Sequence, residues 1–281
     1  MKGILLACLG VLILTPDALL IRLSGLEAAP LVAWRGLAMG SLFLIAAVLT
    51  GQMRLFPRLA SSAGIGLVLA QWANASLFAP AIALAPVALV LIAVATVPIW
   101  AAVLSRVLYG QPTRPATWFT IGAVSVGIIL ATTGKSDVAV TTTSVIGVLC
   151  GLGVALSLAL SFTLLRHNPE MPLLTAVGTG SLPAGITAVG LTSPTAMTSG
   201  TTWAIATASF IVLPLSFYLM SEASRHTASV NVSLVLLLET VLGPVWVWAV
   251  IGETPSATML IGGAIVILSL AIYLVHLRRR T

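Results

Sequence analysis

The sequence predicts an all-α integral membrane protein with ten transmembrane helices, arranged as two inverted sets of five. Three observations predict this fold class. Only 13 Lys or Arg and 7 Asp or Glu occur among 281 residues, 7% in all, against about 25% in a soluble domain. Apolar runs long enough to cross a bilayer recur along the chain. Basic residues are concentrated in alternate connections between these runs.

The composition excludes several classes of protein. Hydrophobic residues make up 59% of the chain and the mean hydropathy is +1.13, so the few charges cannot cover a soluble surface. A soluble enzyme, a disordered tail and a nucleic-acid-binding protein are therefore excluded. Cys8 and Cys150 lie inside apolar runs without metal-ligand spacing, and we interpret them as small packing residues. We expect neither a metal nor a cofactor.

The first five spans follow from apolar runs that are close to the roughly 20 helical residues a bilayer core requires. They are expected at 3–21, 30–50, 61–84, 87–108 and 116–134. The start, Met1-Lys2 and an apolar run, also resembles a secretory signal. Because the run continues to Ile21 without a clear cleavage site, we interpret it as the first membrane helix. The weakest break is the one at Pro80 and Pro86, where the third and fourth spans should form a tight hairpin.

The other five spans begin after a polar, β-branched stretch, Lys135–Thr143. They are expected at 143–165, 172–191, 202–221, 227–250 and 257–276. A β-barrel would show alternation with period two over about ten residues. The runs here are continuous and about twice as long, which favours helices.

The basic residues predict the orientation. With ten spans, the side of both termini carries Lys2, Arg54, Arg58, Arg106, Arg114, Arg166, Arg225, Arg278, Arg279 and Arg280. The other side carries Arg22 and Lys135, and Arg35 lies inside the second span. Cytoplasmic loops are enriched in Lys and Arg, so we expect both termini in the cytoplasm.

Weak internal similarity divides the chain into halves at 1–138 and 142–281. Gly3–Leu6 aligns with Gly147–Cys150, and Leu108–Gln111 aligns with Val250–Glu253. Because each half has an odd number of spans, the second enters the membrane from the opposite side. Inverted repeats of this kind are typical of alternating-access transporters, with the substrate near the midplane between the halves.

Short motifs in both halves resemble the EamA domain of the drug/metabolite transporter superfamily. They are Leu31–Gly36, Pro98 with Gly110-Gln111, and Glu239 with Gly252-Glu253. Gln111 departs from the Glu that this family usually has in the first turn. Overall the chain looks most like the YddG-type bacterial exporters of aromatic amino acids.

The resemblance implies two EamA repeats, 1–138 and 142–281, and a multi-pass protein of the bacterial inner membrane. It also implies export of amino acids, aromatic and other apolar ones above all. Export of another small metabolite or a cationic drug, and an uncoupled channel-like facilitator, are the alternatives. The expected partners are a small-molecule substrate and membrane lipid, without nucleic acid. The oligomeric state is left open, a monomer included.

Polar residues inside spans predict the substrate site, because such groups normally face a bundle interior or a cavity. In the third span Gln71, Asn74 and Phe78 share one helical face, with Trp72 beside them. Amides beside a ring suit a zwitterion with an apolar side chain. Hydrogen bonding between helices is the alternative role.

Glu239 lies in the middle of the ninth span. It could bind a substrate ammonium group or a coupling proton, or be a neutral Glu that is hydrogen-bonded to a neighbouring helix. Asn231 and Trp246 lie on roughly the same face. Further candidates for the substrate site are Trp100, with packing as the alternative, and Ser157, Ser161 and Tyr218.

Candidate moving parts complete the prediction. Asp17 and Arg35 lie at similar depth in the first two spans and are expected to pair near the periplasmic mouth. Pro98 and Pro244 should kink the fourth and ninth spans and act as hinges. Glu222 and Arg225 are expected to form a surface pair.

Overall fold

The computed structural model describes residues 2–85, 87–133, 142–252 and 256–278, and every regular element in these ranges is helical. Within them, nine single helices or runs of two or three consecutive helices are long and apolar enough to cross a membrane. A tenth apolar helix, α7, has a shorter described apolar stretch, Pro115–Ala131. The all-α membrane class is therefore confirmed.

The helices of the first half follow the expected spans within a few residues. They are α1 (Lys2–Leu14), α2 (Asp17–Ser24), α3 (Ala28–Leu49), the 3₁₀ helix η1 (Gln52–Ala60), α4 (Ser62–Leu84), α5 (Val87–Val94), α6 (Val97–Tyr109) and α7 (Pro115–Thr133). Ser61 starts α4 by accepting a hydrogen bond from the amide of Gly64 at 3.1 Å. Gly25 and Gly110 end α2 and α6 with φ of 64° and 65°, a conformation that glycine adopts without strain.

The second half has the same character. Its helices are α8 (Thr142–His167), α9 (Leu173–Gly190), α10 (Pro194–Met197), α11 (Thr202–Thr207), the π-helix η2 (Ala208–Val212), α12 (Leu213–His226), α13 (Ser229–Leu236), α14 (Leu238–Ile251) and α15 (Ala257–Arg278). The eighth span is longer than predicted, because its last turn continues to His226. Pro86, Lys135, Glu253, Arg279 and Arg280 lie outside the described residues.

Three spans are interrupted. The first breaks at Thr15-Pro16 between α1 and α2, the fourth at Ala95-Thr96 between α5 and α6, and the ninth at Leu237 between α13 and α14. Pro98 lies in the first turn of α6, directly after its break. Pro244 does not lie at a break: the ninth span is interrupted well before it, and α14 runs through it. The side chain of Pro244 is outside the described part of the chain.

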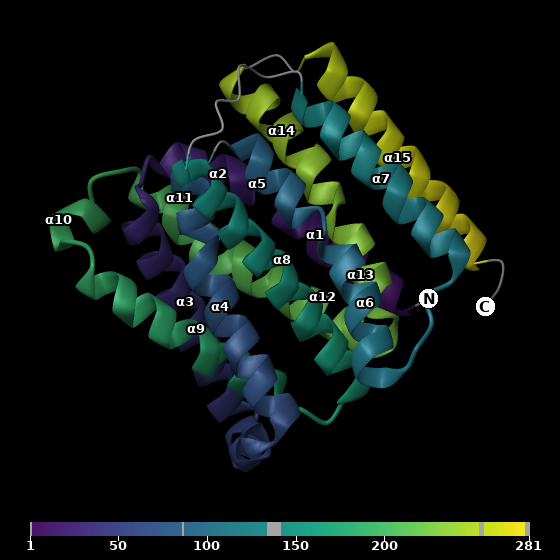
Figure 1. Cartoon of the computed structure of the whole chain (residues 1–281). Coiled ribbons are helices and arrows are strands. Elements are labelled where there is room, and N and C mark those ends of the chain that lie inside the picture. Colours follow the sequence, from purple (N-terminus) through teal and green to yellow (C-terminus); the bar gives the residue numbers. More distant parts are fainter. Residues whose placement is uncertain (1, 86, 134–141, 253–255, 279–281) are drawn as a thin grey trace.

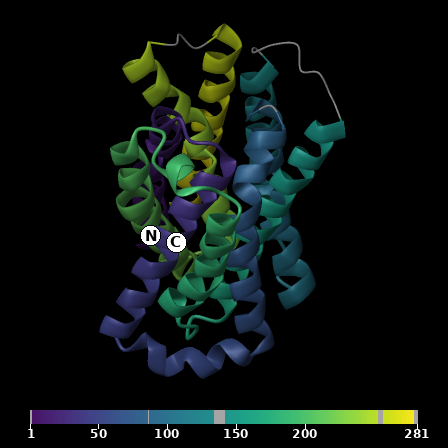
Figure 2. The ribbon, with the colours of Figure 1, turned by 90° about the vertical axis from the view of Figure 1, so that its left-hand side faces the viewer.

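Helices from the two halves alternate in the bundle. The pair α3 and α9 and the pair α7 and α15 make extensive contacts near opposite edges in Figure 1. Between them, α4 packs on α8, α1 on α12, and α6 on both α8 and α13. Figure 2 shows η1 lying across one end of the bundle, below the long helices.

Polar side chains lie buried inside the bundle beside its apolar core, and large apolar side chains cover its outside. Gln71, Ser161 and Ser216 are at most 1% exposed, whereas Leu49, Phe119 and Leu191 are at least 80% exposed. This distribution suits a lipid environment, where buried polar groups find partners and apolar side chains meet acyl chains.

Glycines allow close backbone contact at the two edge pairs. A Cβ added to Gly36 of α3 would lie 2.5 Å from the backbone nitrogen of Gly185 of α9. A Cβ on Gly262 of α15 would collide with the carbonyl oxygen of Gly127 of α7. Small residues at helix contacts let backbones approach and gain van der Waals energy in lipid.

The α3–α9 contact can be tested with Gly36→Val. The new side chain must push the α9 backbone away, so we expect a destabilisation of about 3 kcal/mol. Thermal unfolding of the detergent-purified protein measures it. Gly122→Ala in α7 is the matched control, since no described atom lies within 4 Å of the added Cβ. Equal melting temperatures for Gly36→Val and the control would contradict the proposed importance of this contact.

Candidate functional site

A cavity of about 120 Å³ lies between the halves of the chain, and residues at or beside all three helix breaks line it. Leu14 and Asp17 reach it from the first break, Val94 from the fourth span, and Leu237 from the ninth. Its volume is several times the space that one water molecule needs. Most of its wall is apolar, with ionisable side chains at Asp17, Arg35 and Glu239.

Asp17 and Arg35 form the predicted pair. Nη1 of Arg35 lies 2.9 Å from Oδ1 and 2.8 Å from Oδ2 of Asp17. The side chains are 14% and 3% exposed, so the pair is largely shielded from solvent. Asp17 is in the first turn of α2, where the positive end of the helix dipole favours a carboxylate.

The predicted face of the third span is also brought to the cavity. Gln71, Asn74 and Phe78 all line it. The guanidinium carbon of Arg35 lies 5.2 Å from the centre of the Phe78 ring, within range of a cation–π interaction. Gln71 Nε2 donates to Ser161 Oγ at 3.4 Å, so the amide nitrogen of Gln71 forms a hydrogen bond between α4 and α8.

Glu239 lines the same cavity from the first turn of α14. Asp17 and Arg35 lie close enough to act on it electrostatically. Within the described ranges, its carboxyl group has no hydrogen-bond or ion-pair partner. Among the described residues, no neighbouring helix therefore supplies the hydrogen-bond partner that the alternative role of Glu239 requires.

Several predicted site residues do not line this cavity. Trp72, Tyr218 and Trp246 are 45%, 39% and 45% exposed. Trp246 instead donates from Nε1 to Thr15 Oγ1 at 2.9 Å, and so contacts the first helix break. Trp100 is half-buried and packs against the hydrophobic core.

The remaining candidates, Ser157, Ser161 and Asn231, form hydrogen bonds within the protein. Ser157 and Ser161 donate to Gly153 O and Ser157 O, one turn earlier in α8. Asn231 donates to Thr227 Oγ1 at 2.9 Å and accepts from Tyr273 OH at 2.8 Å, which joins α13 to α15. Of these residues only Ser161 reaches a cavity side chain, through Gln71.

The structure adds cavity residues that were not expected from the sequence. Met39, Phe217, Met220 and Thr240 contribute to the wall. An apolar side chain in a span gives no signal that separates a cavity wall from a lipid-facing surface. Ser181 and Thr240 were polar residues within spans, and that signal could have identified them.

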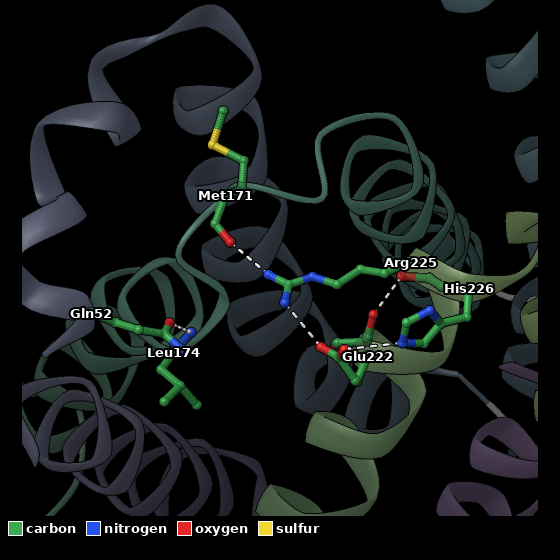
Figure 3. Close-up of polar contacts among 8 residues, drawn as sticks. Gln52, Met171, Leu174, Glu222, Arg225 and His226 are labelled. Atoms are coloured by element: carbon green, nitrogen blue, oxygen red, sulfur yellow. Dashed lines mark hydrogen bonds and ion pairs between the residues drawn. The ribbon is translucent and has the colours of Figure 1, made fainter. Parts of the chain in front are cut away.

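One end of the bundle is joined by a polar network (Figure 3). Arg225 Nη1 lies 2.9 Å from Glu222 Oε2, and Nη2 donates to Met171 O at 2.6 Å. His226 Nε2 lies 3.3 Å from the other Glu222 oxygen. Arg225 and Glu222 are only 17% and 24% exposed, so the expected surface pair is instead partly buried and ties α12 to the loop before α9. We call Glu222, Arg225, His226 and Met171 the end network.

The end network lies at the end of the bundle where α1 begins. A Cβ on Gly3 would be 3.0 Å from atoms of Ala223 and His226. Arg166 Nη1 also donates to Arg225 O at 3.0 Å. Asp17 lies farther along the first span, beyond the α1–α2 break, and Arg35 of α3 is paired with it there.

A helical membrane protein with a charged cavity at broken helices has the general form of a solute carrier. Residues 145–275 match the model of the EamA-like transporter family, which supports a membrane transporter of the drug/metabolite transporter superfamily. Because this is a family of transporters, the match also supports the expectation that the chain is not an enzyme.

Comparison with solved structures supports the fold. One crystal structure matches with a TM-score of 0.80, covering 99% of this chain and 98% of the other at 18% identity. At that identity the likeness shows the fold alone. No curated protein matches the chain. In the described residues, no group of three or more His, Cys, Asp or Glu side chains could hold a metal.

The Asp17–Arg35 pair can be tested by a double-mutant cycle. Arg35→Gln leaves a shielded carboxylate unpaired and should destabilise the protein by about 3–5 kcal/mol. Asp17→Asn together with Arg35→Gln should recover most of that loss, because neither charge remains. Thermal unfolding in detergent measures the two single variants, Arg35→Gln and Asp17→Asn, and the double variant. Strictly additive effects would show that the two side chains do not interact energetically.

Proposed function

We propose that the chain is a secondary transporter that exports amino acids, aromatic and other apolar ones above all, from the cytoplasm across the bacterial inner membrane. The observation that carries this proposal is a mostly apolar cavity with both signs of charge, held between the halves of an EamA-type protein. An amino acid needs partners for an ammonium and a carboxylate and an apolar surface for its side chain. The resemblance to YddG-type exporters points to the same substrates.

We further propose that 1–138 and 142–281 are inverted repeats of five spans each. The contact pattern supports this. Exchanging each span for its counterpart turns the α4–α8 contact into the α12–α1 contact, and maps the α3–α9, α7–α15 and α6–α13 pairs onto themselves. With α7 as the tenth crossing, both termini would lie on one side, and the basic residues would make that side cytoplasmic.

Alternating access requires each end to open in turn. The end network would close the cytoplasmic side, and the Asp17–Arg35 pair would act near the periplasmic mouth. Pro98 lies beside the break in the fourth span, which suits a hinge. For the ninth span, the break at Leu237 is the better hinge position, and Pro244 would influence the helix beyond it.

A cationic substrate is the second candidate. Glu239 has no described hydrogen-bonding partner and could bind an amine directly. The membrane itself and a small solute would then remain the partners, and only the chemistry of the solute would differ. A channel-like facilitator is distinguished from both carriers by the absence of counterflow.

Transport can be measured with purified protein in liposomes. We expect unlabelled internal phenylalanine or leucine to accelerate uptake of the labelled amino acid, since a carrier exchanges solutes through one site. A panel that includes an aromatic amine and a pH gradient tests cargo and proton coupling together. Uptake without counterflow would favour a channel, and exchange of amines but no amino acid would favour the second candidate.

Glu239→Gln tests the cavity carboxylate. Gln keeps the shape of the Glu side chain but carries no negative charge, so it can neither pair with an ammonium group nor take up a proton. Exchange should therefore fall at least tenfold, about 1.4 kcal/mol. Glu170→Gln is the matched control, because the Glu170 side chain is 86% exposed in a loop. Normal exchange by Glu239→Gln would remove Glu239 from the proposed site.

The end network predicts an effect of Arg225→Gln. The variant loses the bonds to Glu222 and Met171, so the population of the state that is open at this end should rise. The expected rise is roughly tenfold, which corresponds to the loss of one charged hydrogen bond. A cysteine at buried Ser221, in a background with Cys8 and Cys150 replaced by Ala, should then react faster with a maleimide. Arg58→Gln, which removes an exposed pair, should leave the rate unchanged. An unchanged rate in Arg225→Gln would exclude a closing role.

A further inference from the structure

The Arg35 guanidinium uses only one of its nitrogens for Asp17. Nη1 serves both carboxylate oxygens, at 2.9 and 2.8 Å. Over the described residues, neither Nη2 nor Nε has a hydrogen-bond partner. A guanidinium carries five N–H donors in a planar fork, so an edge of Arg35 has donors to spare.

The surroundings of Arg35 leave the cavity as the place where those donors can be used. Arg35 lines the cavity, and Phe78, which lines it too, lies 5.2 Å from the guanidinium carbon. Asp17 takes the side of Nη1. Water or a ligand in the cavity can therefore complete the bonding of the guanidinium.

We propose that Arg35 binds the carboxylate of the transported substrate while remaining paired with Asp17. This inference rests on the proposed function, because it names the group in the same cavity that recognises an amino acid. A carboxylate matches the guanidinium fork, and its charge is opposite. Glu239, on the same cavity, receives the ammonium group.

Asp17 then has two effects on binding. It holds Arg35 in place through Nη1, and it competes with the substrate for the same positive charge. The affinity for a carboxylate is consequently set by the pair and not by Arg35 alone. A cation without a carboxylate uses Glu239 only and leaves the Arg35 donors to water.

The experiment compares two probes of equal ring size, L-phenylalanine and 2-phenylethylamine, by counterflow and competition in proteoliposomes. The wild-type protein should prefer phenylalanine. Arg35→Lys keeps the charge but loses the fork, and should raise the KM for phenylalanine roughly ten- to hundredfold with little change for the amine. Asp17→Asn removes the competitor and should lower the KM for phenylalanine only.

Arg58→Lys is the matched control, because it alters an exposed arginine paired with Glu170. Melting temperatures of all variants identify any that do not fold, and the wild-type comparison of the two probes stands without them. Equal KM changes for both probes in Arg35→Lys, or a wild-type preference for the amine, would overturn the assignment of Arg35. Absence of any amino acid exchange by the wild-type protein would instead overturn the proposed function.

Discussion

The close contact between α3 and α9 is the constraint on which the cavity depends. Gly36 meets Gly185, and Gly40 meets Leu182, so the two backbones touch where larger residues would separate them. Arg35 precedes Gly36 and is carried with it to Asp17. Gly180 of α9 lies against Gln71 in the same way, which brings α4 and its polar face to the cavity. A bilayer provides no hydrophobic force between helices, so this packing must supply the association.

Interrupted helices give the cavity its chemistry. Continuous helices satisfy their own backbone groups and leave little for a solute, whereas breaks expose helix ends inside the protein. Asp17 and Glu239 both lie in the first turn after a break, where the helix dipole favours negative charge. One cation, Arg35, lies with them on the cavity wall. The end network and this cavity are on different levels of the bundle, as a gate and a site would be.

Much of the site could be predicted because polar residues in a membrane have few acceptable places. Asp17 and Arg35 were expected to pair from their depth, and they do. Gln71, Asn74 and Phe78 were expected on one face, and all three line the cavity. The tryptophans gave no such guidance. Trp72 and Trp246 are substantially exposed, and Trp100 packs on the core, because an aromatic ring is acceptable at lipid, in a core or in a cavity.

Composition and run length were enough to establish an all-helical membrane protein, and Pro, Gly and polar stretches located its helix ends within a few residues. The tertiary structure decided which faces meet, that the ninth span breaks at Leu237, and that Arg225, paired with Glu222, reaches Met171. The reason is that an apolar helix face is about equally stable against lipid and against a neighbouring helix. Helix rotation is therefore set by packing between helices, at contacts such as Gly36 with Gly185, which no single helix contains.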